Sequence, residues 1–173
     1  MMRVGCMAVL ILFNYVLQST ILVRVSILGV NPDTALIFII SYGILRGDVE
    51  GAIFGFFSGL IHDLFGGHVI GLYAMLGMLT GYLAGKPFKD YFKDNFFLPF
   101  GIVIVASIFY QVLFFVLNFL LGGGWNFWFY FRTIILPTTI YTVSVAIPLY
   151  SLMFVINSKI ENFEDDRRNL FKE

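Results

Sequence analysis

The sequence predicts an all-α polytopic membrane protein whose six transmembrane helices form one compact bundle. The first observation is composition, since 59% of the 173 residues are hydrophobic and only 13% are charged. The second is pattern, because long apolar runs alternate with short groups of charged residues, Gly and Pro. A soluble domain of this length needs a larger charged surface. The net charge of zero gives no indication of a nucleic-acid partner.

Charged residues, Gly and Pro divide the chain into six apolar segments. These segments cover residues 4–23, 33–46, 49–65, 69–85, 96–121 and 131–156. A helix needs roughly 20 residues to cross about 30 Å of hydrocarbon, so the second, third and fourth segments are short. The first segment has no small-residue cleavage site ahead of a polar domain, and it is interpreted as a retained helix.

Basic residues indicate the orientation of the spans, since they concentrate on the cytoplasmic side of a membrane. With the N-terminus inside, nine of the 11 basic residues lie in inner segments, and two, Arg24 and Arg132, lie outside. Both termini are therefore expected in the cytoplasm. Residues 1–158 form the predicted six-helix transmembrane domain, and residues 159–173 form a charged cytoplasmic tail.

Two glycine stripes predict close helix packing. The four-residue series are Gly51, Gly55, Gly59 and Asp63 in the third segment, and Gly77, Gly81 and Gly85 in the fourth. Small residues at this spacing let membrane helices approach backbone to backbone. The short connection "GGHV" makes the two helices antiparallel neighbours, so the stripes either contact each other or each receives another helix.

Few charged residues are expected near the outer surface. The candidate outer charge cluster is Arg24, Asp33, Asp63 and Arg132. Pairing of Asp63 with an arginine would offset the cost of holding charge near lipid. Asp33 also suits a helix start, because "NPD" can cap the second helix and a carboxylate is stabilised by the positive end of the helix dipole.

Polar side chains inside the spans have two interpretations. The residues concerned are Asn14 and Gln18 in the first segment, and Ser107, Gln111 and Asn118 in the fifth. Amides in lipid form hydrogen bonds between helices, each worth roughly 0.6 kcal/mol on average. The alternative is a polar cavity that admits a small molecule.

No catalytic constellation is apparent, and the sequence predicts no catalytic residue, metal or cofactor. His62 and Asp63 are adjacent and therefore diverge on a helix, and His68 follows a Gly-Gly turn, so the three do not converge on a metal. An aspartyl protease needs a second aspartate at similar depth, and the placement of Asp33 is already explained by capping. No nucleophile elbow, Walker loop or Rossmann fingerprint is present.

The run from Pro32 to Gly85 resembles the core of the bacterial rod shape-determining MreD family. The features are "NPD", "RG", "EGAIFGFFSGLIHDLFGG", "GLYAML" and "GYLAG", in the family's order and spacing. Residues at the positions that members share are Pro32, Asp33, Arg46, Gly47, Glu50, Gly51, Gly55, Gly59, Asp63, Gly71, Gly81 and Tyr82. This chain departs from the family pattern at two places. It has His62 where an aliphatic residue is expected, and it has a single "RG" followed by the acidic "DVE" where a doubly basic turn is expected.

The resemblance implies a non-enzymatic scaffold or adaptor of the elongasome, the complex for lateral peptidoglycan synthesis, in the bacterial cytoplasmic membrane. Its implied partner is MreC, a bitopic protein with a periplasmic domain, in an assembly with MreB, RodA and a penicillin-binding transpeptidase. Membrane lipid surrounds the bundle. The hypothesis for binding is that the glycine-lined helices seat the single span of MreC.

A second class remains open, because the architecture is also similar to the substrate-binding S-components of energy-coupling factor vitamin transporters. Gln111, Asn118, Asp63 and Arg132 could line a vitamin cavity near the outer face. An adaptor would fill that volume with apolar side chains, and the 21 phenylalanines favour filling.

Overall fold

The structure, a computed structural model, describes residues 2–20, 31–66, 71–86, 98–120 and 126–170. Within these ranges the chain is helical and contains no strand, so the all-α prediction is confirmed. The helices are α1 (Met2–Thr20), α2 (Thr34–Arg46), α3 (Asp48–Gly66), α4 (Leu72–Gly85), α6 (Leu98–Leu120), α7 (Phe127–Tyr130), the π-helical turn η2 (Phe131–Ile135) and α8 (Leu136–Leu170).

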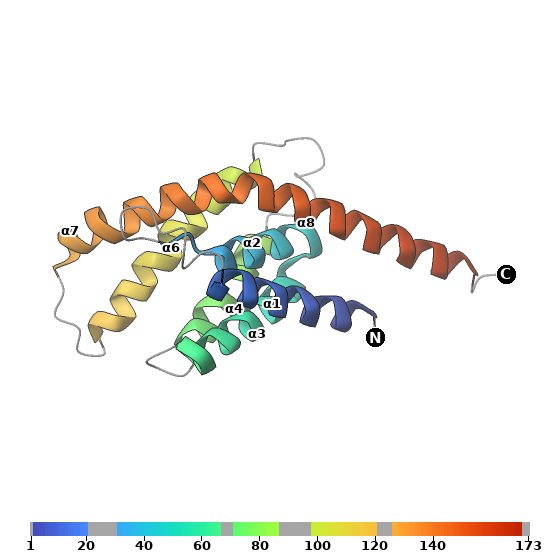
Figure 1. Ribbon diagram of the computed structural model, residues 1–173, viewed down its shortest axis with the longest axis horizontal. Coiled ribbons are helices and arrows are strands. Elements are labelled where there is room, and N and C mark those ends of the chain that lie inside the picture. Colours follow the sequence, from blue (N-terminus) through green and yellow to red (C-terminus); the bar gives the residue numbers. More distant parts are fainter. Residues whose placement is uncertain (1, 21–30, 67–70, 87–97, 121–125, 171–173) are drawn as a thin grey trace.

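α2 is the central helix of the bundle. Every residue from Thr34 to Ile44 is buried, and α2 packs against α1, α3, α4, α6 and α8 (Figure 1). A helix that is apolar on all sides is buried either among other helices or in lipid, and in α2 it is neighbouring helices that provide the cover. Phe38, Ile37 and Ile40 are fully buried and form the centre of the apolar core.

The outer helices carry the apolar surface. In the part of the chain that the structure describes, two helical segments are long and apolar enough to cross a membrane, Phe100–Leu120 with a mean hydropathy of 2.5 and Phe127–Lys159 with 1.8. Shorter apolar segments are Met7–Thr20, Thr34–Arg46 and Leu72–Gly85. Large apolar side chains such as Val105 on α6 and Ile140 on α8 are exposed, as expected of surfaces that contact lipid.

The last predicted segment becomes one continuous helical run with a π turn. In η2 the N–H of Leu136 bonds to the carbonyl of Phe131, five residues back. Pro137 follows directly and has no N–H to donate, which disturbs the regular i→i−4 ladder at this point. α8 then continues past residue 158 to Leu170, so the described part of the charged tail extends the last helix. α1 begins and α8 ends toward the same end of the molecule (Figure 1).

Candidate functional site

α3 and α4 lie antiparallel and pack backbone to backbone through their glycines (Figure 1). A Cβ atom at Gly55 would lie within 3.0 Å of the Gly77 carbonyl, and one at Gly77 would lie within 3.0 Å of the Gly55 carbonyl oxygen. At Gly51 a Cβ atom would lie 2.7 Å from the Gly81 oxygen. Real Cβ atoms do not approach other atoms so closely, so these positions require glycine as long as the two backbones stay in place.

α2 joins the same contact at its C-terminal end. A Cβ atom at Gly51 would also lie 2.6 Å from the Cα of Gly43 in α2, while one at Gly85 would meet the backbone of Gly47 and Asp48. Gly59 lies against the backbone of Tyr73 and Ala74 at the opposite end of the α3–α4 contact. We call this contact the glycine seam. The glycines of α3 lie against the backbone of α4, and those of α4 lie against α3. The two stripes are therefore not open to the span of a partner, contrary to the binding hypothesis from the sequence.

Asp63 ends the stripe of α3 and caps α4. Its Oδ1 accepts a hydrogen bond from the backbone N–H of Tyr73 at 3.0 Å, and its Oδ2 accepts one from the N–H of Ala74 at 2.9 Å. The carboxylate is buried, with 2% of the residue exposed. N–H groups in the first turn of a helix have no partner within the helix, and a negative charge is favoured there. Asp63 therefore ties the end of α3 to the start of α4, and in the described part of the chain no arginine pairs with it.

Two turn glycines have backbone conformations that side-chain-bearing residues rarely adopt. Gly47, between α2 and α3, has φ of 100°, and its N–H bonds to the Gly43 carbonyl at 2.8 Å. Gly71, directly before α4, has φ of 95°. Both positions use glycine because it has no Cβ atom to clash in the left-handed region.

The remaining residues singled out from the sequence are spread over the bundle. The Nε of Arg46 donates a hydrogen bond to Oδ1 of Asn157, which joins the end of α2 to α8. Glu50 is half-buried in the first turn of α3, and Arg132 is exposed in η2. Arg24 lies outside the described residues, and no ion pair joins the other three members of the candidate charge cluster to one another in the structure.

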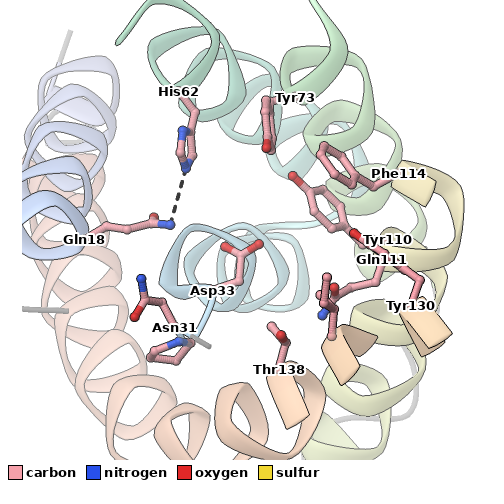
Figure 2. Close-up of a pocket in the computed structure, with 12 residues that line it drawn as sticks. Gln18, Asn31, Asp33, His62, Tyr73, Tyr110, Gln111, Phe114, Tyr130 and Thr138 are labelled. Atoms are coloured by element: carbon pink, nitrogen blue, oxygen red, sulfur yellow. Dashed lines mark hydrogen bonds between the residues drawn. The ribbon is translucent and has the colours of Figure 1, made fainter. Parts of the chain in front are cut away.

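A polar cavity of about 220 Å³ lies at the end of the bundle where α2 begins and α3 ends (Figure 2). Side chains from α1, α3, α4, α6 and the α7–η2–α8 run converge on it around the start of α2. Its lining residues are Gln18, Asn31, Pro32, Asp33, His62, Tyr73, Tyr110, Gln111, Phe114, Tyr130, Ile134 and Thr138. Tyr130, Ile134 and Thr138 are four residues apart, so they present one face of the η2–α8 run to the cavity.

Hydrogen bonds and ring contacts fix several of these side chains. Oδ1 of Asp33 accepts the Leu36 N–H at 3.0 Å, and the Asp33 N–H donates to Oγ1 of Thr142 on α8 at 3.1 Å. Nε2 of His62 lies 3.3 Å from the amide nitrogen of Gln18. The ring of His62 stacks on Tyr73 with centroids 4.9 Å apart and planes 13° apart. The cavity wall is therefore held by contacts between distant segments.

The expected vitamin-cavity residues are found only in part at this cavity. Gln111 lines it, whereas Asn118 is exposed and donates to the Phe114 carbonyl of its own helix at 3.0 Å. Asp63 caps α4 and Arg132 is exposed, so neither lines the cavity. A cavity of about 220 Å³ remains here, and its lining includes Phe114 and Ile134, so apolar side chains fill this volume only in part. Sequence reasoning missed Tyr73, Tyr110 and Thr138 as lining residues. Tyr73 lies near the start of the predicted segment 69–85, whereas Tyr110 lies in the middle of 96–121 and gave no comparable signal.

The helical bundle and its apolar outer helices define an α-helical membrane protein. Comparison with known families gives a narrower assignment, because the family model for the rod shape-determining protein MreD matches residues 1–160. This chain belongs to the MreD family and has a role in determining rod cell shape. The match confirms the resemblance and extends it beyond the run from Pro32 to Gly85. No curated protein and no solved structure matches the chain.

Proposed function

We propose that this protein is a non-enzymatic adaptor of the bacterial elongasome that binds MreC in the cytoplasmic membrane. It spans the membrane six times and keeps both termini in the cytoplasm. The observation that carries the proposal is the family match over residues 1–160, which includes α1, α2, α3, α4, α6, α7, η2 and most of α8. Through MreC the adaptor joins the wider assembly with MreB, RodA and a penicillin-binding transpeptidase.

The glycine seam is closed, so the span of MreC needs another surface. An apolar groove of about 480 Å³ runs between α4 and α6. Its lining residues are Thr80, Leu83, Ala84, Gly101, Ile102, Val105, Ala106 and Phe109. Small side chains in a groove allow a helix to approach closely, and exposed Leu83, Val105 and Phe109 provide apolar contacts. We assign the MreC span to this groove.

The test is recovery of MreC with this protein from native membranes in a mild detergent. Gly101→Leu fills the groove, and the site has room for it because no atom lies within 4 Å of a Cβ atom built there. We expect Gly101→Leu to reduce recovered MreC by about tenfold, which corresponds to about 1.4 kcal/mol. Gly5→Leu is the matched control, since a Cβ atom at Gly5 on α1 also meets no atom within 4 Å.

The results separate the surface from the function. Unchanged MreC recovery with Gly101→Leu would exclude the groove and leave the adaptor function standing. Recovery of paired ATPases with a coupling membrane subunit, in place of MreC, would overturn the adaptor function itself. A vitamin-sized ligand does not fit the polar cavity well, because pockets for such ligands typically hold about 300–1,000 Å³ and this one holds about 220 Å³.

A further inference from the structure

The polar cavity is a recess at one end of a short helix. α2 has 13 residues and is therefore about 20 Å long, which is less than the roughly 30 Å of a hydrocarbon core. Neighbouring helices are longer, and α6 with 23 residues extends beyond α2. The start of α2 thus lies below the rim formed by its neighbours, and the cavity occupies the space above it (Figure 2).

A single carboxylate provides the negative charge of this recess. Among the described lining residues Asp33 is the one acidic residue, none is Lys or Arg, and one is a histidine, His62. Its position is fixed through Leu36 and Thr142, and Figure 2 shows the carboxylate projecting toward the middle of the cavity. A carboxylate held away from bulk water is costly unless a cation or several hydrogen bonds compensate it. The cavity therefore favours a positively charged occupant.

Aromatic side chains form much of the remaining wall. Tyr73, Tyr110, Phe114 and Tyr130 all line the cavity, and the rings of Tyr73 and Phe114 have centroids 5.2 Å apart. Faces of aromatic rings attract cations, and cages of such rings recognise organic ammonium groups. Four rings beside one carboxylate therefore match an ammonium group better than a neutral or anionic one.

One buried hydroxyl supports the presence of a ligand. Thr138 is 8% exposed, and its Oγ1 has no hydrogen-bond partner among the described residues. The side chain points into the cavity from the side opposite His62 (Figure 2). A buried oxygen without a partner costs free energy, whereas an N–H or O–H group of an occupant would satisfy it.

We propose that the polar cavity binds a small organic ammonium group, with Asp33 as its counter-charge and Tyr73, Tyr110 and Tyr130 as its aromatic wall. A volume of about 220 Å³ lies below the range typical of pockets for drug-sized ligands, which favours a group as small as ethanolamine or choline. The group comes either from a phospholipid headgroup or from a free amine. This site goes beyond the adaptor function, which requires no ligand.

The first experiment measures binding of free amines to the purified full-length chain in dodecyl maltoside by isothermal titration calorimetry. Ethanolamine and choline are the probes, and 3,3-dimethylbutan-1-ol is a neutral compound with the shape of choline. We expect the neutral compound to bind at least about tenfold more weakly than choline, because it lacks the charge that Asp33 and the rings attract. Equal binding of both compounds, or no binding of either amine, would contradict the free-amine source.

Variants then test the assigned residues. Asp33→Asn removes the charge but retains a side-chain oxygen for the Leu36 N–H, and Tyr110→Leu removes one ring. Each should weaken amine binding by at least about tenfold. Asp48→Asn is the matched control, since Asp48 begins α3 at the other end of α2 and does not line the cavity. If Asp33→Asn does not fold, Tyr110→Leu and Thr138→Val decide the question.

A lipid experiment distinguishes the two sources. Native mass spectrometry of the same protein, with phosphatidylethanolamine or phosphatidylglycerol added, reports which lipid is retained. Retention of phosphatidylethanolamine that is lost in Asp33→Asn assigns the ammonium group to a lipid headgroup. Binding of free amines without that lipid preference assigns it to a soluble amine. If neither amine binding nor lipid retention changes in Asp33→Asn, the proposal is overturned. An ion pair between Asp33 and His62 within the protein would overturn it as well.

Discussion

Asp63 shows how one side chain can connect two helices of a membrane bundle. Its two oxygens accept the N–H groups of Tyr73 and Ala74, so Asp63→Ala leaves two donors at a buried helix start without partners. Each unsatisfied donor costs about 1–3 kcal/mol, and the favourable charge at the helix dipole is lost as well. We expect a marked fall in Tm in detergent, measured by thermal unfolding of the purified protein.

Asp63→Asn provides a sharper comparison at the same position. An amide offers one oxygen, and its NH₂ group would face the second backbone N–H, so this variant should be nearly as unstable as Asp63→Ala. Asp48→Ala is the control, because the Asp48 side chain accepts only an exposed N–H, from Val49. If Asp63→Asn were as stable as the unchanged protein, capping by the carboxylate would not be what holds α4.

At the scale of elements, the glycine seam sets the distance between α3 and α4. In Gly55→Ala the new methyl group would collide with the backbone of Gly77, which cannot rotate away as a flexible side chain can. Overpacking typically costs about 1–3 kcal/mol, and we expect the upper end of this range because the obstacle is backbone. The measurement is the yield of monodisperse protein in size-exclusion chromatography together with its Tm.

Gly101→Ala is the matched control for this prediction. Gly101 also lies in a helix, α6, but a Cβ atom there would have no atom within 4 Å. Alanine is the better helix former by about 1 kcal/mol, so Gly101→Ala should leave the Tm unchanged or raise it slightly. Equal losses in the two variants would indicate that helix propensity or insertion, and not the seam, limits stability.

At the scale of the whole molecule, the proposed six-span arrangement predicts opposite accessibility for the two ends of the last helical run. Trp128 and Lys159 are both exposed, and they lie 31 positions apart, which corresponds to about 47 Å of helix and is enough to cross a membrane. Cys6 is the only cysteine, so Cys6→Ser gives a background for single cysteines. A membrane-impermeant maleimide on spheroplasts should label Trp128→Cys and leave Lys159→Cys unlabelled until the membrane is opened.

The reverse labelling pattern would invert the orientation deduced from basic residues. Labelling of both cysteines from outside would mean that the run does not cross the membrane. Lys86→Cys, at the end of α4 on the expected inner side, extends the same test to the short helices. It should behave like Lys159→Cys, because both lysines are among the nine basic residues assigned to the cytoplasmic side.

The sequence by itself determined the helical class, the positions of the apolar segments and the family. These properties depend on local composition and spacing: an apolar run long enough to bury its backbone in lipid is helical whatever surrounds it. The four-residue glycine spacing and the positive-φ turns at Gly47 and Gly71 are likewise local, since each is encoded in a few consecutive residues.

Only the tertiary structure decided which surfaces meet. Spacing shows that Gly55 and Gly77 permit close approach, but not that each occupies the other's stripe and thereby closes both to a partner. It shows that Asp63 faces protein, but not that backbone N–H groups receive it in place of an arginine. The polar cavity combines side chains from Gln18 to Thr138 across the whole chain. Such a site depends on how short α2 sits among longer neighbours, which packing between distant segments determines and local sequence does not.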